Sequence, residues 1–262
     1  MPVKRQPRIL IVLAHPDDET LVSGTIALNI HAGASVCLVC ATNGGGGLAP
    51  AETSEKELSE MRKESLKQAC AILGVQRLEL LESRIQLDHS LNRTNYAAVI
   101  DKHRQWVMEL LDDFLPDTVI TFGPEGLTGH ATHIMVGLLT TQAVLLSKRR
   151  RLYYLAFSKA EVSGILNWFL KNPAVTRQYA EEVRRKPNLG AESPVLYPVS
   201  DTIITTRVDI ADVIDVKRRA WQCHCTQGGG GRVLDAFGAN LTESFVRVLP
   251  RPEPHEPIED QL

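Results

Sequence analysis

Long hydrophobic runs are missing from this sequence. None of its 262 residues lies in an apolar segment of the roughly 20 residues that a membrane-spanning helix requires. Basic residues occur near the amino terminus, but the apolar run after them is short and ends at His15-Pro16-Asp17-Asp18, which does not fit a signal peptide. We therefore expect a cytoplasmic protein without a membrane span.

An excess of charge of one sign is also missing. The chain has 29 Lys and Arg residues against 31 Asp and Glu residues, a formal net charge of -2. Without a basic excess, a nucleic-acid partner is not expected. The 5 cysteines are an odd number, which argues against a complete disulfide framework. What remains is a reduced globular protein with enough hydrophobic residues for a substantial core.

Short apolar segments alternate with amphipathic segments along much of the chain. The first kind predicts buried strands, and the second predicts helices. Strands that are apolar throughout predict an α/β fold with a Rossmann-like, mostly parallel sheet and helices on both faces. In such a fold the active site is expected at the carboxyl ends of the strands. The expected strands cover residues 9–13, 35–41, 77–81, 118–122 and 202–208, and the expected helices cover 19–32, 53–73, 95–115, 129–147 and 212–227.

Proline-rich sequence interrupts this rhythm at about residues 158–200, where Pro173, Pro187, Pro194 and Pro198 occur. We interpret this stretch as an insertion or cap within a single domain that covers residues 1–262.

Acidic residues and a histidine crowd together directly after the first expected strand. His15 is followed by Asp17, Asp18 and Glu19. Like charges so close together repel each other, and a bound cation would relieve that repulsion. A simple turn followed by a helix cap is the alternative for this segment, because Asp and Pro also suit helix starts.

A second polar motif, Gly129-His130-Ala131-Thr132-His133, follows the fourth expected strand. The carboxyl ends of parallel strands meet at one edge of a sheet, so this motif is expected to lie close to His15 and Asp18. Two histidines and a carboxylate that leave a position open for water are typical of a catalytic zinc site. Taken alone, the motif could also be a pair of surface histidines.

The segments His15-Pro16-Asp17-Asp18-Glu19 and Gly129-His130-x-x-His133-x-x-x-Gly137 resemble the PIG-L/LmbE-like family of zinc-dependent N-acetylglucosaminyl deacetylases. The resemblance implies that His15, Asp18 and His133 ligate one zinc ion. It also implies that Asp17 acts as the general base and that His130 stabilises the oxyanion. Ferrous iron or another divalent metal stays open for the same ligands.

Three weaker matches to the family concern substrate contacts. The resemblance implies that Arg62, Asp88 and His224 bind substrate. The chain also departs from the family pattern: Thr132 stands where the family often has aspartate, and glycine replaces a glutamate within residues 44–47. These departures leave the metal ligands intact and concern the charge of His130 and the substrate contacts.

The function implied by the resemblance is removal of an acetyl group from an N-acetylglucosamine-type amino sugar or its conjugate. The expected partner is therefore a small-molecule amino sugar, and a homo-oligomer stays open. Two alternatives keep the same fold: a ferrous-iron enzyme with the same ligands, and a non-catalytic sugar- or nucleotide-binding module. Asp17 distinguishes the binding module, which has no need of a second carboxylate beside the ligands.

Overall fold

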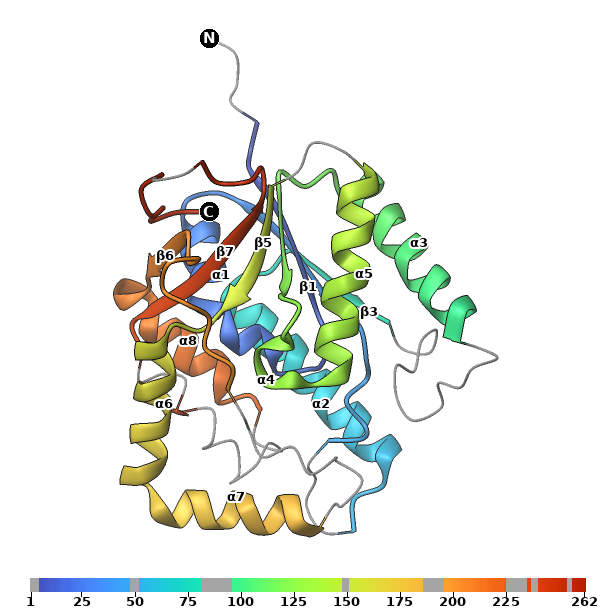
Figure 1. The fold of residues 1–262 in the computed structure, drawn as a ribbon. Coiled ribbons are helices and arrows are strands. Elements are labelled where there is room, and N and C mark those ends of the chain that lie inside the picture. The colour runs from blue at the N-terminus through green and yellow to red at the C-terminus, as the bar shows by residue number, and fades with distance from the viewer. Residues whose placement is uncertain are drawn as a thin grey trace.

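The structure is a computed structural model that describes residues 5–47, 52–81, 96–147, 151–185, 196–224, 235–236, 240–253 and 256–262. Within these ranges the centre of the molecule is a seven-stranded sheet in the order β3-β2-β1-β4-β5-β7-β6 (Figure 1). The strands are β1 Arg8–Leu13, β2 Ser35–Cys40, β3 Arg77–Leu80, β4 Thr118–Phe122, β5 Arg151–Ala156, β6 Thr206–Asp209 and β7 Thr242–Leu249.

The first five strands in chain order pair in parallel, and β7 pairs antiparallel with both β5 and β6. The expectation of a mostly parallel α/β sheet is confirmed. Strands β5 and β7 are not among the strands expected from the sequence, and the strand expected from residue 202 begins only at Thr206. Strand β7 was missed because it carries charged residues in its interior. Glu243 and Arg247 are accommodated there by ion pairs to Lys217 and Glu259.

Helices cover both faces of the sheet. On one face α3 packs against α5, and on the other α1, α2 and α8 pack together (Figure 1). Helices α6 and α7 lie within the stretch interpreted as an insertion. The helices are α1 Ser23–His31, α2 Glu55–Leu73, α3 Tyr96–Phe114, α4 Gly126–Gly129, α5 Ala131–Ser147, α6 Lys159–Lys171, α7 Pro173–Arg185 and α8 Ile214–Trp221, with short 3-10 helices at Asp18–Leu21 and Ala211–Val213.

Local sequence signals explain where α2 begins and ends. The Ser54 side chain accepts a hydrogen bond from the amide of Glu57, and the Glu57 side chain accepts one from the amide of Ser54. This reciprocal capping box satisfies amides that a helix start leaves unpaired. Gly74 ends the helix with a left-handed φ of 81°, which glycine adopts without steric cost.

The register of β1 and β4 brings together the two histidine motifs. The two strands are parallel neighbours, with Ile9 opposite Thr118 and Ile11 opposite Ile120. Both strands therefore end at the same edge of the sheet, where α4 lies in Figure 1. In the described part of the chain, no helix is long and apolar enough to cross a membrane.

Candidate metal centre and active site

The segment after β1 folds back so that Asp18 faces His15. The Oδ2 atom of Asp18 accepts hydrogen bonds from the amides of Ala14, at 3.1 Å, and His15, at 2.7 Å. A carboxylate bound by backbone amides is fixed in orientation. The same atom lies 3.5 Å from Nδ1 of His15. The spacing of these two residues in the sequence thus places an imidazole and a carboxylate on the same side of one turn.

His133, in the first turn of α5, completes a triangle of possible ligand atoms. Its Nε2 atom lies 3.1 Å from Nδ1 of His15 and 3.4 Å from Oδ1 of Asp18. In a tetrahedral zinc site with bonds of about 2.0–2.1 Å, neighbouring ligand atoms are about 3.3 Å apart. The three observed separations, from 3.1 to 3.5 Å, involve both oxygens of the Asp18 carboxylate and lie close to the spacing of ligands around a single ion of this size. The residues present therefore fit a divalent metal.

The orientation of the His133 ring is fixed from two sides. Its Nδ1–H donates to the carbonyl oxygen of Gly126 at 2.9 Å, which leaves the Nε2 lone pair for a metal. The ring also stacks on Phe122, with 4.1 Å between ring centroids and 9° between the planes. Gly137 lets α5 approach this strand, because a Cβ atom there would lie 2.4 Å from the carbonyl oxygen of Phe122.

Electrostatics in the triangle favour a cation. Burial raises the pKa of Asp18, but the neighbouring His133 and His15 more than offset this and hold it well below its usual value. Burial lowers the pKa of His15 to about 4, so this ring is neutral and its Nδ1 can act as a ligand. Burial lowers the pKa of His133, but the neighbouring Asp18 more than offsets this and raises it. A bound cation would take the place of the proton that this carboxylate favours on His133, and carboxylate and imidazole groups are ligands that a zinc-type ion prefers.

Asp17 lies next to the triangle in a strained backbone conformation. Its φ of 130° is unusual for a residue with a side chain, a conformation that costs about 1–3 kcal/mol and persists only where neighbours hold it. Burial raises the pKa of Asp17 to about 6, and the positive charge of Arg62 opposes that shift. The Arg62 guanidinium lies 3.1 Å from Oδ1 of Asp17.

His130 faces the same centre from the start of α5. The rings of His15 and His130 have centroids 4.7 Å apart, and one ring nitrogen from each of His15, His130 and His133 lies within 4.8 Å of the other two. The amide of Thr132 donates to Nδ1 of His130 at 3.2 Å. With Nδ1 as the acceptor, the proton of the neutral ring is on Nε2, so the ring is oriented without the aspartate that the family often has at position 132.

The residues expected to contact substrate have different surroundings. Arg62 is buried, and its guanidinium donates to the carbonyl oxygens of Gly44, at 2.9 Å, and Pro16, at 2.8 Å. His224 is 0% exposed and its Nε2–H donates to Oε1 of Glu19 at 2.5 Å. Their substrate contacts stay predictions. Asp88 lies outside the described residues.

Two residues at the site were not identified from the sequence. Glu19 belongs to the first motif but received no role, and its carboxylate is buried between Asp17 and His224. Tyr197 lies near the end of the proline-rich stretch and is 45% exposed. Its amide donates to the carbonyl oxygen of Leu127, and its ring covers Gly129, where a Cβ atom would lie 3.0 Å away. No spacing in the sequence connects Tyr197 to the histidine motif.

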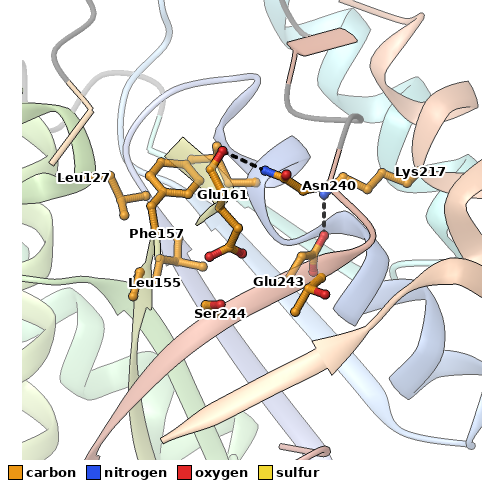
Figure 2. A pocket seen from close by; sticks show the side chains of 11 residues that line it. Leu127, Leu155, Phe157, Glu161, Lys217, Asn240, Glu243 and Ser244 are labelled. Atoms are coloured by element: carbon orange, nitrogen blue, oxygen red, sulfur yellow. Dashed lines mark hydrogen bonds and ion pairs between the residues drawn. The ribbon is translucent and has the colours of Figure 1, made fainter. Parts of the chain in front are cut away.

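A small cavity lies at the end of β5 (Figure 2), and none of the proposed metal ligands lines it. Leu127 and Phe157 form an apolar wall, and Glu161, Lys217 and Glu243 contribute charged groups. The space open to the centre of a water molecule is about 20 Å³, room for about one water. The cavity is too small for a sugar ring in this conformation.

Comparisons with known proteins agree with this geometry. The model of the PIG-L family, described as GlcNAc-PI de-N-acetylase, matches residues 10–144. A 1D-myo-inositol 2-acetamido-2-deoxy-alpha-D-glucopyranoside deacetylase from Mycobacterium sp. (strain JLS) is 32% identical over 84% of this chain and 74% of its own length. The residues that the family model matches include His15, Asp18 and His133.

Solved structures share the fold. The N,N'-diacetylchitobiose deacetylase of Pyrococcus horikoshii is 20% identical, covers 90% of this chain and 72% of its own, and has a TM-score of 0.53. The 4-carboxy-2-hydroxymuconate hydratase GalB of Pseudomonas putida KT2440 is 16% identical, covers 96% of this chain and 100% of its own, and has a TM-score of 0.63. At such identities the likeness concerns the fold alone.

Fold and site together are those of an α/β enzyme in which histidines and a carboxylate at the carboxyl edge of a parallel sheet could hold a metal ion. Within that class, the chain belongs to the PIG-L family. The expectation of a deacetylase of this family, a hydrolase that acts on N-acetyl amide bonds, is confirmed by the family match and by the curated relatives.

Proposed function

We propose that the protein hydrolyses the acetamide of an N-acetylglucosamine-type sugar or its conjugate with the help of one divalent metal ion, zinc in the first instance. The observation that carries the proposal is the triangle of His15, Asp18 and His133, with Asp17 and His130 beside it. A metal held there would polarise the acetyl carbonyl group and make a bound water more acidic. The relatives named as deacetylases of an acetamido sugar support this choice of substrate.

Asp17 is the group that takes a proton in this reaction. It lies next to the ligand Asp18 in the sequence, and burial has raised its pKa to about 6, in the range that suits a general base at neutral pH. Arg62 fixes the position of its Oδ1 atom. The proton that Asp17 accepts is available for the departing amine.

His130 is the group that meets the negative charge on the carbonyl oxygen. Its Nδ1 atom accepts a hydrogen bond from the amide of Thr132, so Nε2 carries the proton that the ring can donate. Donors fixed in advance toward a developing oxyanion contribute about 3–4 kcal/mol of transition-state stabilisation. The neighbouring Tyr197 ring provides an exposed aromatic surface on which a sugar can pack.

The proposal is tested by a deacetylation screen of N-acetylglucosamine conjugates that differ in the group at the anomeric carbon. Release of free amine is measured on the protein as purified, after chelation, and after zinc is restored. We expect amine release from at least one conjugate, its loss with chelator and its return with zinc. Metal-loaded protein that releases no amine from any conjugate would contradict the proposal.

A further inference from the structure

The carboxylate of Glu19 connects the general base to a distant part of the chain. Its side chain is 1% exposed. Oε2 accepts a hydrogen bond from the amide of Asp17 at 3.0 Å, and Oε1 accepts one from Nε2 of His224 at 2.5 Å. One buried carboxylate therefore joins the turn after β1 to the end of α8.

The backbone of Asp17 needs such support because of its positive φ of 130°. Its carbonyl oxygen accepts from both the amide, at 3.0 Å, and the hydroxyl group, at 2.6 Å, of Thr20. Its amide donates to Glu19. The direction of the Asp17 side chain depends on this backbone conformation, so the partner of the amide affects where the carboxylate points.

His224 belongs to a set of three residues that we call the α8 clasp: Lys217, Trp221 and His224. They are spaced at four and three positions, the repeat that places side chains on one side of a helix. Trp221 Nε1–H donates to the carbonyl oxygen of Thr20 at 3.3 Å. Every member of the clasp acts on the segment from Glu19 to Thr25.

Lys217 acts on that segment through Glu243 of β7. Its ammonium group lies 2.5 Å from Oε1 of Glu243, and both side chains are buried (Figure 2). The carboxylate of Glu243 also accepts hydrogen bonds from the amides of Gly24, at 3.0 Å, and Thr25, at 2.8 Å, in the first turn of α1. The clasp thus holds the segment after Asp17 at both of its ends, at Glu19 and Thr20 and at the start of α1.

We propose that Glu19 and His224 are positioning residues that hold Asp17 in its working orientation, with the α8 clasp as their support. The inference rests on the proposed function, since the residue that Glu19 and His224 position is the general base of that reaction. His224 is fully buried, so its effect reaches the reaction through Glu19 and not through contact with substrate. The resemblance to the family implied a substrate contact instead.

The first test compares Glu19→Ala and His224→Phe with conservative variants. We expect both disruptive variants to lower kcat by about 10–100-fold, because small misplacements of a catalytic group have effects of that size, while KM changes by less than about twofold. Glu19→Gln and His224→Gln can still bridge the two segments and should restore most of kcat. A rise in KM with unchanged kcat would overturn the proposal in favour of substrate binding.

A double-mutant cycle separates positioning from general damage to the fold. If Glu19 acts through Asp17, Glu19→Ala should reduce the residual rate of an Asp17→Asn protein by less than about threefold, because the group that it positions is already lost. The same full loss in both backgrounds would overturn the proposal. Tyr153→Phe is the matched control, since it removes one hydrogen bond, which joins β5 to Glu259 near the carboxyl terminus.

Hydrogen exchange of the metal-free protein gives a readout that needs no activity. Peptides that contain Asp17 and Thr20 should exchange at least about tenfold faster in Glu19→Ala and His224→Phe than in wild type, and Tyr153→Phe should match wild type. Unchanged exchange at Asp17 would overturn the positioning role. A wild-type protein with protected Asp17 but no deacetylase activity would contradict only the proposed function. If Glu19→Ala fails to fold, His224→Phe and the Gln variants carry the same comparison.

Discussion

At the scale of single residues, two adjacent aspartates have opposite properties. Asp18 is hydrogen-bonded by two amides and faces His15 and His133, which keep its pKa well below the usual value. Burial raises the pKa of Asp17 to about 6, against the effect of Arg62. Pairs of carboxyl groups whose environments separate their pKa values are typical of sites in which one group binds and the other moves a proton.

Replacing Asp17 by asparagine tests this division of roles. We expect Asp17→Asn to lower kcat by about 10²–10⁴-fold, the usual contribution of general acid–base catalysis, because the amide cannot accept the proton. Metal content, measured by elemental analysis, should stay at the wild-type ratio, since the proposed ligands are His15, Asp18 and His133. Wild-type kcat in this variant would remove the general-base role, and loss of metal would make Asp17 part of the metal centre.

The exposed ring of Tyr197 is proposed to pack on the sugar, and kinetics of variants tests this contact directly. If its ring packs on the sugar, Tyr197→Ala should raise KM by about 5–30-fold, the loss of one aromatic contact worth roughly 1–2 kcal/mol, with a smaller change in kcat. Tyr197→Phe keeps the ring and should have a KM within about twofold of wild type. Steady-state kinetics on the conjugate found in the screen decides, and an unchanged KM in Tyr197→Ala would exclude the contact.

At the scale of elements, close packing of α5 on β4 sets the position of His133. Gly137 lies one turn after that histidine, and a Cβ atom there would come within 2.4 Å of the carbonyl oxygen of Phe122 and 3.2 Å of its Cβ atom. Any side chain at this position pushes the helix away from the strand. The glycine in the motif thus has a structural reason that the spacing alone does not reveal.

Gly137→Ala is therefore expected to weaken both folding and metal binding. Overpacking of this kind lowers the free energy of unfolding by about 1–3 kcal/mol, and the shifted helix should raise the Kd for zinc. Urea unfolding of the metal-free protein and a competitive zinc titration measure the two effects. Gly46→Ala is the control, because a Cβ atom at Gly46 meets nothing within 4 Å. Equal values for both variants would refute the packing argument.

Helix α3 carries a buried histidine that makes stability depend on pH. His103 is 0% exposed, and neither of its ring nitrogens has a hydrogen-bond partner among the described residues. Burial lowers its pKa from 6.5 to about 4. Between these values the unfolded chain binds a proton that the folded chain does not, so the free energy of unfolding falls as pH falls through this window and is fully restored above it.

His103→Leu should remove this pH dependence. From about pH 7 to about pH 5, the free energy of unfolding of the wild type should fall by up to about 2 kcal/mol more than that of the variant, since each unit of pKa corresponds to about 1.4 kcal/mol. Urea unfolding at both pH values measures the difference. His31→Leu, at an exposed position, serves as the control. Parallel pH curves for wild type and His103→Leu would contradict the assignment.

The central α/β pattern could be predicted, and so could the proximity of His15, Asp18 and His133, because both depend on short-range sequence. Apolar strands are recognisable by composition, and polar residues directly after two of them necessarily meet at one edge of the sheet. The mixed part of the sheet could not be predicted, because Glu243 and Arg247 are stable in β7 only through ion pairs with residues distant in sequence. The surroundings of His224 and Tyr197 also depend on such long-range packing.

At the scale of the whole molecule, the site collects residues from both halves of the chain. The turn after β1 provides His15, Asp17 and Asp18, and the segment where α5 begins provides His130 and His133. The α8 clasp holds the first of these segments through its hydrogen bonds to Glu19 and Thr20. The metal ion would join the two main segments. Binding to the folded form alone also stabilises a protein, so folding and metal affinity should be linked.

The most direct test of the account is the location of the metal in crystals grown with zinc, by anomalous scattering at the zinc absorption edge. The account predicts one strong peak with zinc bonds of about 2.0–2.2 Å to Nδ1 of His15, Nε2 of His133 and the Asp18 carboxylate, with His130 and Asp17 outside bonding distance. A peak bonded to His130 instead of Asp18, or no peak at this edge of the sheet, would contradict it.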